Sequence, residues 1–285
     1  MDRDLLDILM ITYDRPEYTR RSLERLLETC TDQMRVWVWH NGNDPETLDV
    51  VRSLIEHPRI HRFHNSPENV GLEGPTNWLW SNADGAYVSK VDDDCLVPDN
   101  WAEELIEIHR RNSRVGAVGC WRFYDEDFVP RLAEKKIVKL NGDHRLMQNC
   151  WVQGSSYVLK RRCIEAHGLL DRKTNFTLYC IKLALAGWIN GWRYPFLHEE
   201  HMDDPRSPYT TLKTDADFTQ NRPLSAVVAE VASLAEWANR VRYMARSAQE
   251  ASLDPRQHVG WRKKIRGLGR RMKRVIGVRE RWRLS

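Results

Sequence analysis

Three features are missing from the sequence of 285 residues, and each absence excludes a class of protein. No apolar run is long enough to cross a bilayer, so we expect no membrane-spanning helix. The N-terminus is acidic and lacks the basic start and small-residue cleavage site of a signal peptide, which favours a cytoplasmic location. The six cysteines contain no CxxC spacing, which indicates reduced thiols rather than a disulfide framework or a zinc site.

Charge is abundant but unevenly distributed along the chain. The net charge is +4, yet residues 261–285 alone carry +10 and the remaining residues carry −6. In this basic tail, apolar residues recur at mostly three- and four-residue steps among lysines and arginines, which is typical of a helix lying in a membrane interface. We therefore expect peripheral binding to the inner face of the cell membrane. The alternatives are a helix packed on the protein itself and phosphate contacts with nucleic acid, which is not the expected partner.

Short apolar segments alternate with amphipathic segments along the chain. Strands are predicted over 7–13, 34–44, 59–65, 86–93 and 115–124, and helices over 15–30, 47–57, 74–83, 101–111, 176–188 and 223–251. A strand followed by a helix is predicted over 151–171, whereas 125–150 and 199–210 are expected to be irregular. The alternation predicts an α/β fold with a mostly parallel sheet and helical crossovers.

Three consecutive carboxylates, Asp92, Asp93 and Asp94, stand at the end of the fourth predicted strand. Adjacent like charges repel and lose solvation when buried, so a cation is the obvious compensating partner. The outer carboxylates of Asp-x-Asp can converge on a hard cation such as Mg²⁺ or Mn²⁺. The alternative is an acidic surface turn, or a capping cluster for the helix near Trp101. Residues 13–14 and 41–44 also fall at the ends of predicted strands, so polar groups should gather at one rim of the sheet.

Four segments together resemble a known family. They are ILMITYDRPEYTRRSLERLL, VWVWHNGND, NVGLEGPTNWLWSNADGAYVSKVDDDCLVPDNW and GSSYVLKRRCIEAHGLLD. In this order they resemble the GT-A fold glycosyltransferases of the nucleotide-diphospho-sugar transferase superfamily, particularly the family 2-like group. The likeness covers about residues 5–212. It implies a GT-A catalytic domain over 1–215, with a nucleotide-sugar half over about 1–100 and an acceptor half over about 101–215. A helical extension over 216–260 and the basic tail would follow.

The resemblance also implies which residues bind the donor and a metal ion. The nucleotide sugar would be bordered by Thr12, Tyr13, Asp14, Arg15, Asn43, Asp44, Asn69, Gly71, Asn77, Asp92 and Asp93. Mn²⁺ or Mg²⁺ would be held by Asp92, Asp94 and His201. The alternatives are that these residues are turn, strand or surface residues without a ligand, and that 198–205 is a solvated acidic loop. His198 and His201 are one residue short of the HExxH zinc spacing.

One departure from the family concerns the catalytic base. Inverting members usually carry an acidic pair before the helix that follows the acceptor segment, but no acid stands between Asp171 and the helix predicted over 176–188. The base would be Asp171 itself, Glu199, Asp203 or Asp204. Alternatively the enzyme is retaining and needs no such base.

These observations lead to one expected function and one alternative. We expect a metal-dependent glycosyltransferase that moves a sugar from a UDP-sugar to a hydroxyl of a saccharide or lipid-linked glycan in surface polysaccharide synthesis. The tryptophan-rich segments 151–157 and 187–194 are either acceptor walls or core. Nucleotidyl transfer is disfavoured because no glycine-rich phosphate loop follows the first strand. The alternative is a non-catalytic adaptor that binds membrane or nucleic acid through the basic tail.

Overall fold

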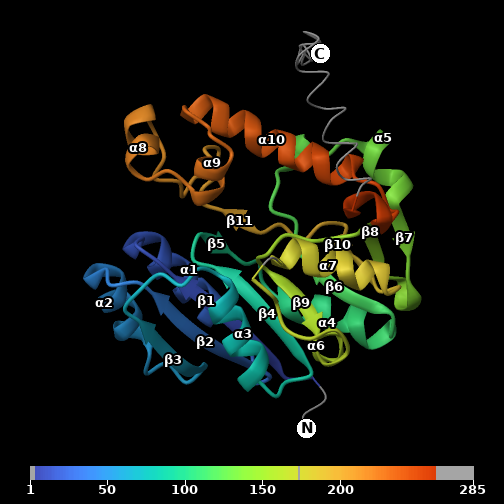
Figure 1. Cartoon of the computed structure of the whole chain (residues 1–285), viewed down its shortest axis with the longest axis horizontal. Helices are drawn as coiled ribbons and strands as arrows, with labels where there is room; N and C mark the ends of the chain where they lie inside the picture. Colours follow the sequence, from blue (N-terminus) through green and yellow to red (C-terminus); the bar gives the residue numbers. More distant parts are fainter. Residues whose placement is uncertain (1–3, 173, 261–285) are drawn as a thin grey trace.

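The computed structural model describes residues 4–172 and 174–260, so the basic tail lies outside the described residues. A nine-stranded sheet with the order β3-β2-β1-β4-β9-β6-β10-β8-β7 forms the centre (Figure 1). Its strands are β1 (Leu6–Thr12), β2 (Met34–Asn41), β3 (Ile60–Ser66), β4 (Tyr87–Asp92), β6 (Val115–Gly119), β7 (Ile137–Lys139), β8 (Arg145–Asn149), β9 (Tyr157–Lys160) and β10 (Ile189–Tyr194). A separate two-stranded sheet pairs β5 (Cys95–Leu96) with β11 (Glu200–His201).

Helices cover both faces of the large sheet. They are α1 (Pro16–Glu28), α2 (Pro45–Leu54), α3 (Glu73–Asn82), α4 (Trp101–Arg111), α5 (Pro130–Ala133), α6 (Arg161–His167), α7 (Phe176–Leu185), α8 (Asp215–Gln220), α9 (Leu224–Val228) and α10 (Leu234–Glu250). One core cluster includes residues of α1, α2 and α4, and the other includes residues of α3, α6 and α7. The expected α/β class is therefore confirmed.

The N-terminal half of the sheet is parallel, as predicted. β1 pairs in parallel with both β2 and β4, and β2 pairs in parallel with β3. All seven residues of β1 are buried, with Ile8 and Met10 in one core cluster and Leu9 and Ile11 in the other. Covering both faces requires a continuous apolar strand, and this is why these segments are easy to recognise in the sequence.

The C-terminal half is mixed, and it departs from the predictions. β9 runs antiparallel to β4 and β6, and β8 runs antiparallel to β10 and β7. Segment 125–150 is therefore not irregular, because it contains β7, β8 and the short helix α5. Segment 187–194 supplies β10, which lies inside the sheet. The single helix expected over 223–251 is two helices, with Glu230 at a positive φ of 56° between them.

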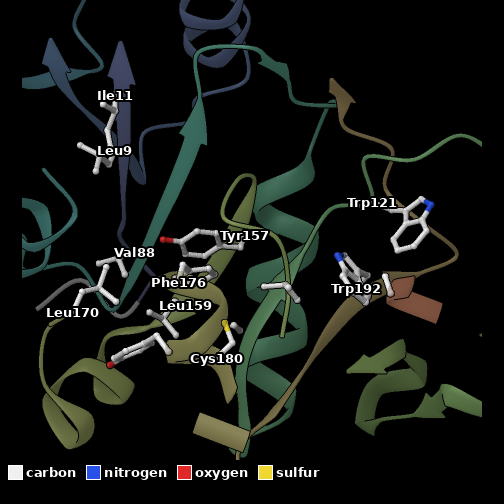
Figure 2. Close-up of a cluster of buried hydrophobic side chains, with 14 of the residues drawn as sticks. Leu9, Ile11, Val88, Trp121, Tyr157, Leu159, Leu170, Phe176, Cys180 and Trp192 are labelled. Atoms are coloured by element: carbon white, nitrogen blue, oxygen red, sulfur yellow. The ribbon is translucent and has the colours of Figure 1, made fainter. Parts of the chain in front are cut away.

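The second core cluster extends from the parallel strands to the C-terminal helices. Figure 2 shows part of it, with Tyr157 of β9 beside Phe176 of α7 and with Trp121 and Trp192 beyond them. Trp237 and Ala245 of α10 belong to the same cluster as Leu9. In Figure 1, α8, α9 and α10 lie across the end of the molecule toward which β1 and β4 point. Within the described residues, no helix is both long and apolar enough to span a bilayer.

Candidate active site

The polar side chains that the sequence placed at strand ends do gather at one rim. β1 ends at Thr12, β2 at Asn41 and β4 at Asp92, and these strands are neighbours and parallel. Their carboxyl ends must therefore meet at the same edge of the sheet, where ligands bind in open α/β sheets. Thr12 is fully buried, and its hydroxyl lies 3.1 Å from Nδ1 of His40 on β2.

The three consecutive carboxylates of the rim have three different sets of partners. Asp92 forms an ion pair with the buried Lys90, two residues earlier on β4. Asp93 accepts hydrogen bonds from the backbone N–H of Tyr13 at 3.0 Å and from the Thr19 hydroxyl at 3.3 Å. Burial, assisted by the charge of Asp94, raises the pKa of Asp93 to about 7. The acidic cluster is thus built into the fold of β1 and α1 and is not a solvated turn.

Asp94 meets His201 because β5 pairs with β11. In that ladder His201 is opposite Cys95, and the backbone N–H of Met202 donates to the carbonyl oxygen of Asp94 at 2.8 Å. Oδ2 of Asp94 lies 3.8 Å from Nε2 of His201. Burial lowers the pKa of His201, which favours the neutral imidazole that binds metals.

Arg15 links Asp94 to a second carboxylate. Its Nη1 lies 3.3 Å from Oδ2 of Asp94 and 2.9 Å from Oδ2 of Asp203. Burial alone would raise the pKa of Asp94, but His201 and Arg15 hold that pKa below its usual value. Burial and the charge of Asp94 raise the pKa of Asp203 well above normal. Of this pair, Asp94 is therefore the more acidic carboxyl group.

The ligand atoms at Asp94 and His201 fit a hard divalent cation. An ion bonded at about 2.1 Å to each atom can bridge a gap of up to roughly 4.2 Å, which exceeds the observed separation. Among the described residues, the group that could hold a metal comprises Asp94, Cys95 and His201. Burial raises the pKa of the Cys95 thiol, which donates to Oδ1 of Asp94 at 3.2 Å, and sulfur is a poor ligand for hard cations. The carboxylate suits Mn²⁺ or Mg²⁺, and the neutral imidazole suits Mn²⁺. Asp92, the other expected ligand, is outside this group.

Arg122 is a neighbour of the cluster that sequence reasoning missed. Its Nη1 lies 3.4 Å from Nε2 of His201, and its Nη2 contacts the sulfur of Met244 on α10. No ion pair of Arg122 with a carboxylate occurs in the described part of the chain. A partly buried guanidinium without an acidic partner is suited to bind an anionic ligand. No sequence pattern marks Arg122. The sequence predicts a strand over 115–124 that would include this residue, whereas β6 ends at Gly119.

The expected nucleotide residues of β1 and β2 lie around the turn after β2. The exposed ring of Tyr13 covers Gly42, where an added Cβ would lie 3.1 Å from the ring. Asp14 is exposed and has a positive φ of 49°. Asn43 is exposed, whereas Asp44 caps α2 by accepting from the Thr47 N–H at 2.7 Å. Hydrogen bonding with the side chain and the backbone N–H of Thr47 lowers the pKa of Asp44.

Asn41, which was expected at the rim but not among the nucleotide residues, joins this turn to the segment before α3. Its Nδ2 donates to Oδ1 of Asn69 and to the carbonyl oxygen of Gly71, each at 3.0 Å. Gly71 has a φ of +74° and open space around it, so a ligand could approach its backbone. Asn77 is occupied elsewhere, because its amide bonds both backbone groups of Leu170 at 2.9 and 3.0 Å. Asn41, Asn69 and Gly71 thus form one surface, and Asn77 anchors the loop after α6.

Comparison with a protein-family model identifies the family of this chain. Residues 7–165 match the model described as glycosyl transferase family 2. The chain belongs to glycosyl transferase family 2. The matched segment includes the acidic cluster and Arg122, but His201 lies beyond its end.

Curated relatives of this family 2 member are distant. It is 22% identical to an uncharacterized glycosyltransferase of Methanocaldococcus jannaschii over 64% of this chain and 66% of the relative. It is 27% identical to the succinoglycan biosynthesis protein ExoM of Rhizobium meliloti over 61% of this chain and 56% of the relative. The chain therefore spans less than two thirds of the length of these relatives.

Solved structures show the same fold. The mannosyltransferase PcManGT of Pyrobaculum calidifontis, in complex with GDP-Man and Mn²⁺, superposes with a TM-score of 0.59 at 18% identity, over 95% of this chain and 81% of that one. TarS 1–349 of S. aureus, in complex with UDP, superposes with a TM-score of 0.55 at 12% identity, over 92% and 91%. The expected GT-A fold and family 2 membership are confirmed.

The four base candidates of this family 2 member differ in exposure. Asp171 is exposed and accepts a hydrogen bond from the Thr174 hydroxyl at 2.6 Å. Glu199 is fully buried, and burial raises its pKa to about 7. Asp203 is held by Arg15, as described above. Both oxygens of the buried Asp204 bond to Arg206, at 3.0 and 2.7 Å.

Proposed function

We propose that this family 2 member is a metal-dependent glycosyltransferase. It would move a sugar from a nucleotide-diphosphate sugar, most simply a UDP-sugar, to a hydroxyl of a saccharide or lipid-linked glycan in surface polysaccharide synthesis. The observation that carries the proposal is the meeting of Asp94 and His201 at the end of β4, 3.8 Å apart. The complexes of PcManGT with GDP-Man and Mn²⁺ and of TarS with UDP support a nucleotide-sugar donor. The name of ExoM supports a polysaccharide product.

The residues of the rim suggest a division of labour. Asp94 and His201 would hold Mn²⁺ or Mg²⁺, with Asp92 beside them, and such an ion neutralises the charge that grows on a departing diphosphate. Arg122 lies next to His201 and would bind phosphate oxygens by charge-assisted hydrogen bonds. The ring of Tyr13 and the surface formed by Asn41, Asn69 and Gly71 would border the base and ribose.

A general base must reach the acceptor hydroxyl, and this requirement favours Asp171 among the four candidates. Asp171 is the exposed one, whereas the other three carboxylates are buried. The Asn77 side chain bonds both backbone groups of Leu170, the residue immediately before Asp171, and so fixes the start of the loop that carries Asp171. We therefore infer that Asp171 takes the role that the acidic pair plays in inverting relatives.

Release of nucleotide tests the proposed activity. The full chain is incubated with Mn²⁺ and a panel of UDP- and GDP-sugars, and free UDP or GDP is measured. Wild-type protein is expected to release nucleotide from at least one donor, and Asp94→Ala to lose roughly 10³-fold of that rate. Asp99→Ala is the matched control, because Asp99 is a nearby acid whose side chain is 80% exposed. If calorimetry finds that no nucleotide binds, the activity is refuted and the adaptor alternative is favoured.

Membrane binding of the basic tail is a separate proposal, since residues 261–285 lie outside the described residues. Each lysine or arginine near an anionic leaflet contributes about 1 kcal/mol, so a tail of this charge should hold the protein at a lipid surface. The full chain should pellet with anionic liposomes, whereas a variant lacking 261–285 should stay in the supernatant. Equal pelleting of both forms would exclude the tail as the anchor.

A further inference from the structure

A groove with a volume of about 640 Å³ lies beside the paired strands β5 and β11. One wall is a face of α1, and the opposite wall includes Leu96, His198, Glu200 and Tyr209. Neighbouring side chains of a strand point to opposite sides. Glu200 accordingly lines the groove, whereas the next residue, His201, faces Asp94. The two strands therefore stand between this groove and the proposed metal site.

The charges on the α1 wall compensate one another. Arg21 and Arg25 alternate with Glu24 and Glu28 on this face. Arg25 donates to the carbonyl oxygen of Val97 at 2.8 Å and lies 3.7 Å from Glu28. A phosphate site needs an excess of positive charge, and a lipid site needs a mainly apolar lining. This groove has neither property.

The opposite wall presents fixed polar groups. Oε1 of Glu200 accepts a hydrogen bond from the Tyr124 hydroxyl at 2.7 Å, and Oε2 lies 3.3 Å from Nε2 of His198. Each carboxylate oxygen can accept a further hydrogen bond, so Glu200 offers oriented acceptors to a ligand that donates hydroxyl groups. Because Tyr124 and His198 already hold the carboxylate, little side-chain entropy is lost when it binds a ligand.

An aromatic face completes the lining. The Tyr209 side chain is 44% exposed, and the Arg21 guanidinium lies 5.8 Å from the centre of its ring. An aromatic ring offers an apolar face, whereas arginine and glutamate bind hydroxyl groups at the edge of a ligand. Apolar faces with hydroxyl edges and no net charge are the properties of a neutral sugar unit.

We propose that this groove is a second saccharide-binding site, separate from the transfer site, that holds units of the acceptor glycan away from the reacting end. The inference rests on the proposed glycosyl transfer, since it names where a long acceptor would be held. A volume of about 640 Å³ lies within the range of small-molecule sites. The β5–β11 ladder connects the two sites through the bond from the Met202 N–H to the Asp94 carbonyl.

Saturation-transfer NMR on the full chain tests the site directly. The probes are maltotetraose, mannotetraose and cellotetraose, without any donor. At least one is expected to bind, and Tyr209→Ala is expected to weaken that binding roughly tenfold, the loss of one good contact. Arg21→Ala should weaken it as well. Leu224→Ala, which alters a side chain 70% exposed on α9, is the control and should bind normally.

Two further measurements separate this inference from the proposed activity. UDP and GDP binding with Mn²⁺ is measured on the same variants by calorimetry and should be unchanged in Tyr209→Ala. Saccharide binding should also persist in Asp94→Ala, because Asp94 lies on the other side of the strands. The inference is overturned if no probe binds, if Tyr209→Ala binds as wild type does, or if UDP with Mn²⁺ displaces the saccharide. A failure of the transferase proposal would instead show in the nucleotide measurements.

Discussion

At the ends of β1, β2 and β4 the sheet presents polar side chains, whereas beyond β6 and within β10 it presents aromatic rings. Trp121 stacks on Phe196 with ring centres 4.6 Å apart and meets Trp192 edge-on at 5.1 Å. Trp121 and Trp192 are almost fully buried. The parallel half thus ends in polar side chains, and the mixed half ends in packed aromatic rings.

This difference has a cause in strand direction. Parallel neighbours bring all their carboxyl ends to one edge, but the antiparallel β9 and β8 bring amino ends there as well. The rule that ligands bind at carboxyl ends then applies to the first half alone. Substitutions in the first half should therefore alter chemistry, and most substitutions in the second half should alter stability.

Asp171 provides the strongest test of this comparison. If it is the general base, a loop of the second half of the sheet contributes to catalysis. Asp171→Asn should lower kcat by about 10²- to 10⁴-fold with nucleotide affinity unchanged, as expected for removal of a general base. Steady-state kinetics and calorimetry measure the two quantities. Asp143→Asn, at a side chain 90% exposed, is the control and should keep full activity. A normal kcat for Asp171→Asn would remove this residue from the mechanism.

Trp237 of α10 tests the structural role of the second half. Its side chain is buried, and Nε1 donates to the carbonyl oxygen of Asp203 at 2.7 Å. Trp237→Ala should lower the free energy of unfolding by about 3–5 kcal/mol, because a large cavity replaces the ring. Trp237→Phe keeps a ring and loses the hydrogen bond, so it should cost less. Equal costs for both variants in urea unfolding would contradict the packing argument.

His109 is expected to make the free energy of unfolding depend on pH. This buried imidazole of α4 bonds the carbonyl oxygen of Val158 at 2.9 Å, and burial lowers its pKa to about 3 from 6.5. Between these values the unfolded chain binds the proton and the folded chain does not, so stability falls as pH drops below 6.5. The loss should reach about 2 kcal/mol between pH 7.5 and pH 5.

The variant His109→Gln isolates this contribution. Its side chain does not titrate, so urea unfolding at several pH values should show a loss about 2 kcal/mol smaller over the same interval. An unchanged pH dependence would mean that His109 is not the group responsible.

Arg122 should have the smallest effect, although it connects the two halves. It follows β6 yet lies 3.4 Å from His201 at the rim. Arg122→Ala should weaken UDP or GDP binding with Mn²⁺ about tenfold, since one charge-assisted contact is lost. Arg122→Lys should recover part of that affinity, and Arg256→Ala, at a side chain 75% exposed, should bind as wild type does. Calorimetric affinities equal for all four proteins would exclude contact with the diphosphate.

The sequence predicts the first half of the fold well and the second half poorly. β1, β2 and β4 are covered on both faces and are therefore rich in apolar residues, and their predicted bounds are close to the observed ones. β7 and β11 have three and two residues, too few to show any period. Their existence depends on partners far along the chain, which no local pattern records.

The candidate site divides in the same way. The family resemblance implies a metal site at Asp94 and His201, and the structure brings these two side chains together. Arg122 was missed, and Asn41 was expected only as a polar residue of the rim, because the contacts of both residues run between elements far apart in the sequence. Arg15 was expected to border the nucleotide sugar, and Lys90 was not singled out. Only the fold shows that Lys90 pairs with Asp92 and that Arg15 pairs with Asp94.

Because β5 pairs with β11, the contact between Asp94 and His201 can form only late in the synthesis of the chain. A ribosome delivers the acidic residues long before it delivers His201, so a nascent chain that has folded its first half still lacks the imidazole. In the proposed metal site, an ion could reach both Asp94 and His201 only after β11 has joined β5. Any fragment that stops at the end of the family-model match, at residue 165, would keep the carboxylates and have no means of completing the pair.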